Sequence, residues 1–456
     1  MKKNNYFLFV IVFFSYKTIY AQNTKWTLEN CIKYAIKNNI SVKNIELDVK
    51  NSEIDKKTAL GNFLPSLNLN ATHSWNIGLN QDITTGLLRN QTTQFTSASA
   101  SVGIDIYKGL KNLNTLRLAN LSKVATQYQL LKMKEDITLN VVNAFLQILF
   151  NQENLKVQLE QLNISENQLI RSEELVSAGT LPRGDILDIK ASVTTNIQNV
   201  IIAENTLLIS KLSLSQLLQL KDFDTFNIAT EEYLDFNYTI LNKDPNIIYE
   251  KAIENRTEIK IAKTNLEIAQ KNLVIARGGF YPSLTGFYNF NSRVSDANDL
   301  LKNSEGQIIG IRGPNSFLMQ FNANKGQSFG GQLTIPLFNG FTVKNNVERS
   351  KVLIQKSKMT LQQQEQDLQR NVYTAFIDAK GALKAYESTL KSLEARQQSY
   401  KFAKERYEMG MINSFELNQS QALLANAQSD VIKTKYDFIF KIKILEFYFG
   451  IPIIKN

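Results

Sequence analysis

The side chains with the widest chemical use are scarce in this sequence, which contains one cysteine and one histidine among 456 residues. The single thiol, Cys31, cannot close an intramolecular disulfide or build a thiolate zinc cluster. The single imidazole, His73, excludes most histidine-based metal sites and catalytic pairs. We also find no glycine loop suited to phosphate and no Ser/His/Asp set. We therefore predict no catalytic residue, no metal site and no cofactor.

Both residues have structural interpretations. Cys31 lies within a helical pattern, where a buried and inert thiol is expected. His73 belongs to an otherwise apolar strand face near Trp75. This position favours an interfacial location beside aromatic residues over a role as a ligand or a base.

Carboxylates follow two similar turns that contain glycine. The residues concerned are Gly179, Pro182, Asp185 and Asp188 in the first turn and Gly410, Asn413 and Glu416 in the second. Glycine permits a left-handed helix end, and proline or asparagine suits the start of the next helix. A carboxylate in the first helical turn is favoured by the helix dipole, so capping alone explains each acid. Capping does not explain why the whole pattern occurs twice.

The helices around these turns have apolar residues at seven-residue spacing. In the first half they are Val141, Ile148, Leu155, Leu162, Leu169 and Val176, then Ile186, Val193, Val200, Leu207 and Leu214; in the second half they are Val372, Ala379, Tyr386, Leu393, Tyr400 and Tyr407, then Leu417, Leu424, Val431, Phe438 and Leu445. Heptad spacing indicates left-handed coiled-coil packing. The stretch Leu110–Val176 lacks Pro and Gly, and as one helix it would extend about 100 Å.

We predict four long helices, over residues 109–178, 183–219, 340–409 and 414–449. The simplest interpretation of each pair is a plain antiparallel coiled-coil hairpin. Four strands, each preceding or following a helix, are predicted over residues 65–80, 93–107, 282–296 and 326–338, where apolar and Asn/Ser/Thr residues alternate. These segments reach the roughly 10 residues that cross an outer membrane at a tilt. A soluble sandwich would alternate too, and four strands cannot close a barrel, so the strands belong either to a shared barrel or to ordinary hairpins.

The sequence contains an internal repeat. Ala59–Leu67 (ALGNFLPSL) matches Ala276–Leu284 (ARGGFYPSL), and Ile106–Gly109 matches Leu337–Gly340 at a longer separation. The difference corresponds to an insertion in the second copy, between its two strands. We predict a first repeat over residues 22–240 and a second over 241–456, each containing a helix, two strands, a very long helix and another helix.

The first 21 residues have the features of a secretory signal peptide. Lys2 and Lys3 precede a short apolar core, and Ala21 is a small residue at the expected cleavage site. Removal of residues 1–21 takes Lys2, Lys3 and Lys17, so the formal charge falls from +10 to +7. An exported chain with this charge spread along its helices is not expected to bind nucleic acid.

The sequence resembles the TolC family of outer-membrane efflux and secretion channels. The likeness rests on the paired segments Phe63–Leu67 and Phe280–Leu284, on Gly109 and Gly340 at the strand-to-helix junctions, and on the two helical turns. It covers nearly all of the chain after the signal peptide. The resemblance implies a mainly α fold with a small β part, in which the long helices form a trimeric α-barrel tunnel joined to one 12-stranded outer-membrane barrel, four strands per subunit.

The resemblance also implies partners and sites. The chain would sit in outer-membrane lipid as a homotrimer, reach into the periplasm, and meet a periplasmic adaptor and an inner-membrane pump of the RND or ABC type. The implied docking residues at the tips are Gly179, Thr180, Leu181, Pro182, Gly410, Met411, Ile412 and Asn413. The implied constriction residues are Glu416, Gln419, Asp185 and Asp188. Gln419 departs from the family pattern, which has an acid at that place.

Three functions are compatible with these patterns. The first is a passive exit duct of a tripartite efflux or type I secretion system. The second is an exported periplasmic coiled-coil structural or adaptor protein without a channel. The third, a secreted enzyme, would need a convergent polar site that the sequence does not contain. The duct accounts for strands, helices and duplication together.

Overall fold

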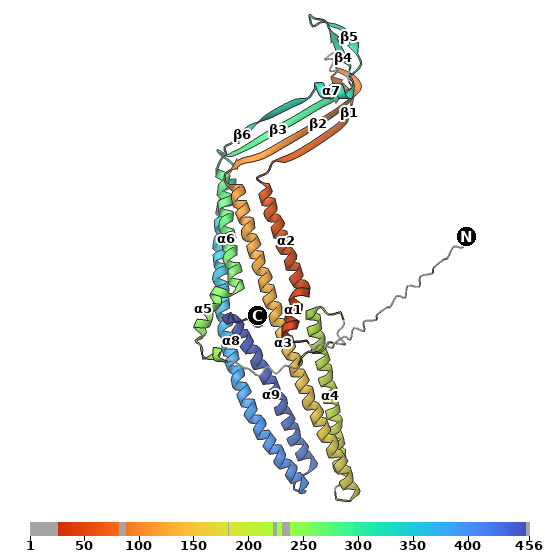
Figure 1. Cartoon of the computed structure of the whole chain (residues 1–456), viewed down its shortest axis with the longest axis vertical. Helices are drawn as coiled ribbons and strands as arrows, with labels where there is room; N and C mark the ends of the chain where they lie inside the picture. The colour runs from red at the N-terminus through yellow and green to blue at the C-terminus, as the bar shows by residue number, and fades with distance from the viewer. Residues whose placement is uncertain are drawn as a thin grey trace, which may run out of the picture.

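A computed structural model of the chain describes residues 26–81, 88–180, 182–221, 226–229, 238–296 and 298–452. The predicted signal peptide at residues 1–21 and the predicted docking residue Leu181 lie outside the described residues. The molecule is elongated, with a sheet at one end and helices that run to the opposite end (Figure 1). Among the described residues, no helix has the length and apolar character needed to cross a membrane.

The first half begins with α1 (Leu28–Asn38) and α2 (Ile40–Gly61), where the sequence predicted one helix. The break falls at Asn39, whose backbone is extended and whose side chain accepts a hydrogen bond from Ser41 N at 2.9 Å. Asparagine at such a position caps a new helix start. Two long helices follow the strands, α3 (Lys111–Ser177) and α4 (Arg183–Leu218).

The second half has the same order. The 3₁₀ turn η1 (Thr239–Asn242) precedes α5 (Pro245–Asn255) and α6 (Thr257–Arg277), and η2 (Gly278–Phe280) leads into the strands; the long helices are α8 (Thr342–Glu408) and α9 (Ser414–Phe449). Helices α3 and α8 each contain 67 residues, and α4 and α9 each contain 36. These equal lengths support the proposed duplication.

The main sheet contains β1 (Ser66–Gln81), β2 (Leu88–Lys108), β3 (Ser283–Ser295) and β6 (Gly326–Thr334), antiparallel and in the order β1-β2-β3-β6. Pairing of β2 with β3 joins the two halves of the chain. Strand β6 ends before the predicted residue 338, because Pro336 lacks the N–H that a strand ladder needs. The sheet is open, with β1 and β6 at its edges.

The two faces of the sheet differ in polarity. One cross-strand row contains Leu67, Val102, Tyr288 and Phe329, while the next row on the opposite face contains Asn68, Ser101, Asn289 and Ser328. The apolar face is uncovered around Leu67, which is 71% exposed, and Phe329, which is 84% exposed. The strand alternation in the sequence therefore corresponds to one apolar and one polar surface.

The insertion in the second half forms further elements that the sequence did not predict. It contains the hairpin β4 (Asp299–Lys302) and β5 (Ile308–Arg312), followed by the short helix α7 (Phe317–Ala323). All three lie at the end of the sheet farthest from the long helices (Figure 1). The insertion thus extends the distal end of the molecule.

Two buried apolar clusters, which we call the equatorial core, hold the helices together near the middle of the bundle. One includes Cys31, Phe145 and Leu214 from α1, α3 and α4, together with Tyr436 and Ile439 of α9. The other is formed by η1, α5, α6, α8 and α9; its most buried members are Ile248, Ala252, Ile259, Val372, Ala379 and Leu445. Because α9 contributes to both clusters, the equatorial core joins the two halves.

A glycine makes the tight junction between β2 and α3. Gly109 has a φ of +58°, and a Cβ there would lie 2.4 Å from the carbonyl oxygen of Gly278. Any side chain would therefore collide with the backbone that leads into β3. The corresponding Gly340 also has a positive φ, of +57°. These conformations give a physical reason for the glycine at each of the paired junctions in the sequence.

Candidate functional site

The turn between α3 and α4 closes with the hydrogen bonds of a Schellman motif. Gly179 has a φ of +75°, and its N–H donates to the carbonyl of Val176 at 3.0 Å. The N–H of Thr180 donates to the carbonyl of Leu175, also at 3.0 Å. Pro182 is the N-cap of α4 and has no side-chain cap bond. Glycine is required here because the left-handed conformation disfavours a side chain.

The turn between α8 and α9 repeats this geometry. Gly410 has a φ of +72° and donates to the carbonyl of Tyr407 at 2.9 Å, while Met411 N donates to the carbonyl of Arg406 at 2.8 Å. The difference lies at the helix restart, where the Asn413 side chain accepts a hydrogen bond from Glu416 N at 2.9 Å. The second turn therefore has a side-chain cap at the start of α9, which holds the backbone of Glu416 in place.

The carboxylates behind the turns lie at the molecular surface. Asp188 and Glu416 are exposed, Asp185 is half-buried, and Gln419 is exposed. Within the described residues, no ion pair joins any of the three carboxylates to a cation. Ser414 and Leu417, on either side of Glu416, are 1% and 4% exposed, so they anchor the first turn of α9. The charges are thus free to face groups outside this chain.

A groove of about 720 Å³ separates the two tips and is lined by both. Its predicted site residues are Thr180, Pro182 and Asp185 from the first tip, and Gly410, Met411, Ile412, Asn413 and Glu416 from the second. The structure therefore brings together eight of the residues implied by the family resemblance. Gly179, Asp188 and Gln419 do not line this groove.

Residues that the sequence did not identify as site residues also line the groove, and two of them connect the tips. Arg171 Nη1 of α3 lies 3.0 Å from Glu408 Oε1 of α8, which forms an ion pair between the two halves. Tyr407 lines the groove and a smaller cavity next to it, and its hydroxyl is buried without a hydrogen-bond partner among the described residues. Burial raises the pKa of the neighbouring Tyr400 hydroxyl, and the negative charge of Glu408 raises it further.

The sequence did contain a signal for these tyrosines. Tyr400 and Tyr407 occupy heptad positions, where an aliphatic side chain would pack without a polar atom. A hydroxyl at a coiled-coil seam carries a desolvation cost unless it finds a partner. Such residues are therefore candidates for contacts beyond their own hairpin.

The contact between the two hairpins, along α3 and α9, is polar near the tips. We call this contact the tip-ward seam; its residues are Asn154, Gln161 and Ser165 of α3 and Gln421, Gln428 and Ser429 of α9. Gln421 Nε2 donates to Gln161 Oε1 at 3.1 Å, and Gln161 Nε2 donates to Gln428 Oε1 at 3.2 Å. Gln161 and Gln421 are nevertheless 3% and 4% exposed. Hydrogen bonds, rather than apolar side chains, thus join the hairpins here.

The aromatic residues of the sheet lie as a membrane-facing surface would have them. His73 Nδ1 is 2.8 Å from Thr96 Oγ1, and the His73 and Trp75 rings meet edge to face with centroids 4.3 Å apart. Trp75 is 59% exposed and Ile77 is 82% exposed on the apolar face. In the part of the chain that the structure describes, no group of three or more His, Cys, Asp and Glu residues is arranged to hold a metal ion.

Comparisons with known proteins agree with this geometry. The sequence profile of the family described as "Outer membrane efflux protein" matches residues 31–219 and 248–439. No curated protein matches the chain. The chain is similar to the outer membrane protein VceC from Vibrio cholerae (14% identity, TM-score 0.72, covering 93% of this chain and 96% of that one).

Two outer membrane channels give comparable values. CmeC from Campylobacter jejuni has 17% identity and a TM-score of 0.74, covering 94% of this chain and 86% of that one. MtrE from Neisseria gonorrhoeae, solved in its open state, has 16% identity and a TM-score of 0.70, covering 93% and 88%. At these identities the likeness establishes the fold, and the predicted mainly α fold with a small β part is confirmed.

Proposed function

The chain belongs to the outer membrane efflux protein family, and from this premise we propose that it forms the exit duct of a tripartite efflux or type I secretion system. It lies in the outer membrane and extends into the periplasm. The observation that carries the proposal is the open sheet with one exposed apolar face, joined directly to two helical hairpins. The family is one of efflux proteins, so membership does not support the alternative of a periplasmic coiled-coil protein.

The edges of the sheet support assembly with further copies. Strands β1 and β6 each present an unpaired edge, and such an edge is not tolerated in a lipid bilayer. Four strands are too few to close around a lumen, so closure requires strands from other subunits. Three copies would supply the 12 strands that the family resemblance implies. The Asn/Ser/Thr face would then line an aqueous lumen, and the apolar face would contact lipid.

The tips suit contacts with an adaptor and closure of the tunnel. The groove between them has polar and apolar residues from both turns and is open to solvent, as a docking surface for a helical partner would be. Glu416 has no ion pair within the described residues, so its charge is not compensated within the chain. If the second tips meet at the three-fold axis of a trimer, then three such charges would lie near one another. Their repulsion and contacts with the adaptor would favour opening, whereas the Arg171–Glu408 ion pair between the hairpins would favour closure. A periplasmic adaptor and an inner-membrane pump are the partners that the proposed role requires at the tips.

Fractionation tests this proposal. An exit duct should be recovered from outer membranes only with detergent, whereas a periplasmic coiled-coil protein should leave the cell with the osmotic-shock fluid. Recovery in the shock fluid would overturn the proposed duct.

A second experiment addresses the cargo. Deletion of the gene should either increase sensitivity to toxic small molecules, as an efflux duct predicts, or remove proteins from the secreted proteome, as type I secretion predicts. We propose that the chain itself catalyses no reaction, since passage through a lumen requires only walls and a gate.

A further inference from the structure

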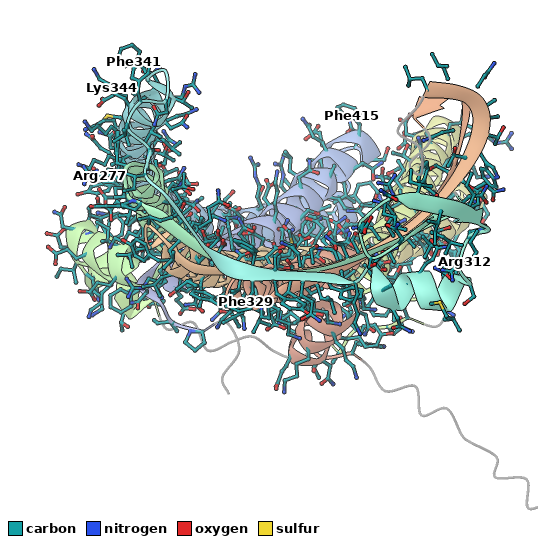
Figure 2. All side chains as sticks on the ribbon, turned by 90° about the horizontal axis from the view of Figure 1, so that it is seen from above. Arg277, Arg312, Phe329, Phe341, Lys344 and Phe415 are labelled. Atoms are coloured by element: carbon teal, nitrogen blue, oxygen red, sulfur yellow. The ribbon has the colours of Figure 1, made fainter. Side chains whose placement is uncertain are left out.

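Helix α7 packs on the outer, apolar face of the sheet. Ser292 Oγ donates to the carbonyl of Phe321 at 2.7 Å, and the Phe290 and Phe321 ring centroids are 6.2 Å apart. In the strand register, Ser292 and Phe290 belong to the same face as Phe329. Viewed from above, the sheet is curved, and α7 lies on its convex side together with the labelled Phe329 (Figure 2). The helix is therefore outside any lumen that the concave face would enclose.

The polar side chains of α7 replace a missing strand. Strand β6 pairs with β3 only as far as Asn291, so among the described residues no strand pairs with the β6 side of β3 beyond this residue. Gln320 Oε1 accepts a hydrogen bond from Ser295 N at 3.0 Å, and Gln320 Nε2 donates to Ser295 O at 2.9 Å. Asn324 Nδ2 donates to Arg293 O at 2.7 Å. The amides thus satisfy backbone groups that would otherwise be exposed at the sheet edge.

The side of α7 away from the sheet is uncovered and mainly apolar, with Asn322 as its exposed polar residue. Leu318 is 71% exposed and Met319 is 59% exposed, whereas Phe317 stacks on Phe321, whose ring faces Phe290 of the sheet. A helix on the surface of a water-soluble domain has the reverse arrangement, with apolar residues inside and polar residues outside. Polar groups bonded to the protein and apolar groups outside are the arrangement that a hydrocarbon environment favours. The environment expected around α7 is therefore lipid.

We propose that α7 is an interfacial helix whose outward side binds the acyl chains of outer-leaflet lipid at the distal rim of the sheet. This inference rests on the proposed function, because it takes the apolar sheet face to contact the membrane. Helix α7, with Leu318 and Met319, lies on the same side of the sheet as Trp75 and Phe329, so one environment accounts for all of them. The exposed basic residues Arg312 and Lys325 precede and follow the helix in the sequence. Basic residues beside an interfacial helix suit contact with lipid phosphates.

A second copy of the chain is the competing occupant. If the neighbouring subunit covered α7, then Leu318 and Met319 would be buried in a protein interface instead of lipid. The two occupants differ in whether a small apolar molecule dissolved in the bilayer reaches these side chains.

Spin labelling of Leu318→Cys measures this directly. The full chain, reconstituted in vesicles of phosphatidylethanolamine and phosphatidylglycerol, is tested for collisions of the label with oxygen, which concentrates in lipid, and with a water-soluble nickel chelate. Phe329→Cys serves as the sheet-face control and Glu305→Cys, in the β4–β5 turn, as the aqueous control. Met319→Cys repeats the test at a second position. Cys31 is 0% exposed, so the unmodified chain should take up no label.

The proposal predicts that Leu318→Cys and Met319→Cys have oxygen-to-nickel accessibility ratios close to that of Phe329→Cys and several-fold above that of Glu305→Cys. High nickel accessibility at both positions would overturn it in favour of water. Low accessibility to both reagents would overturn it in favour of a protein contact. High nickel accessibility of Phe329→Cys itself would show that the sheet does not lie in the membrane, which contradicts the proposed function. High nickel accessibility of the α7 positions alone would contradict only the proposal that α7 is an interfacial helix.

Discussion

The two hairpins meet along α3 and α9, and this contact differs in chemistry between its two ends. In the equatorial core, Tyr436 and Ile439 of α9 join a buried apolar cluster that includes Phe145 of α3. In the tip-ward seam, Gln421 bonds to Gln161 instead. Apolar burial is lost only by exposing surface to water, whereas a hydrogen bond contributes a net of about 0.5–1.5 kcal/mol because water can replace it.

Within each hairpin, buried apolar residues continue close to the tip, beside polar contacts such as the one from Asn196 of α4 to Ser165 of α3. Ile189 and Val193 of α4 and Leu417 and Leu424 of α9 are buried near the turns. Each hairpin is therefore held together more strongly than the two hairpins are held to one another. We infer that the hairpins can separate at the tips as intact units while the equatorial core keeps its structure, which is what a gated tunnel would require.

The largest effect is expected from a cavity in the equatorial core. Phe145 is 0% exposed. Phe145→Ala should lower the free energy of unfolding by about 3–5 kcal/mol, since it removes a buried ring and leaves a cavity. Phe415→Ala, at the 65%-exposed position of the second tip, is the matched control and should have little effect. Thermal unfolding followed by circular dichroism in detergent compares them; equal effects would remove the distinction between core and tips.

Loss of Arg256 should be the next largest effect. Its guanidinium lies 3.2 Å from Glu135 Oε2 and 2.9 Å from Glu258 Oε2, and it stacks on the Phe447 ring at 3.9 Å. Arg256→Ala leaves two carboxylates without their cation and should cost about 2–3 kcal/mol, less than a fully buried pair because both acids are partly exposed. Asn39, at the corresponding helix break of the first half, is the control: Asn39→Ala should cost about 1 kcal/mol by loss of the cap.

Glu135 should make the stability of the protein sensitive to pH. Burial raises the pKa of its carboxyl above the ordinary 4.5, although Arg256 acts in the opposite direction. The folded state then binds the proton more tightly than the unfolded state. This contribution to stability is present below pH 4.5 and is lost as the pH rises through the raised pKa. Glu135→Gln should flatten this part of the pH profile of the unfolding temperature; an unchanged slope would contradict the assignment to Glu135.

A smaller effect is expected in the tip-ward seam. Gln421→Ala removes hydrogen bonds to Gln161 and Ser165 and should lower stability by about 1 kcal/mol. The loss should be local. Hydrogen exchange is expected to speed up in the turns of both hairpins and to stay unchanged in α1 and α5. Faster exchange in the equatorial helices as well would show that the seam and the core form one cooperative unit.

The smallest effect on stability, with a clear effect on conduction, is expected from Glu416. Its side chain is exposed, so Glu416→Gln should leave the unfolding temperature almost unchanged. If it lines a constriction, then removal of the charge should reduce the preference for cations in single-channel recordings. Asp185→Asn tests the corresponding acid of the first tip. Unchanged selectivity in Glu416→Gln would exclude a constricting role.

Local patterns in the sequence were enough to predict the long elements. The heptad spacing predicted a helix over 109–178, and α3 runs from Lys111 to Ser177; alternation predicted a strand over 65–80, and β1 runs from Ser66 to Gln81. The helix break at Asn39 was missed because one capping side chain within an apolar pattern is a weak signal.

Contacts between distant parts of the chain were beyond such patterns. The Arg171–Glu408 ion pair depends on how the two hairpins pack, which no local spacing specifies. Helix α7 was missed for a different reason. Seven residues give too short a period to recognise, and its polar residue Gln320 bonds to the protein. A pattern search that assumes water outside would assign its faces the wrong way round.

The four-stranded sheet is expected to become complete only with other copies of the chain. Native mass spectrometry of the protein, extracted from outer membranes in detergent, measures the number of copies directly. A single species with three chains is expected. A monomer stable in detergent, or a protein recovered without detergent, would contradict it, because the unpaired edges of β1 and β6 would then need no partner.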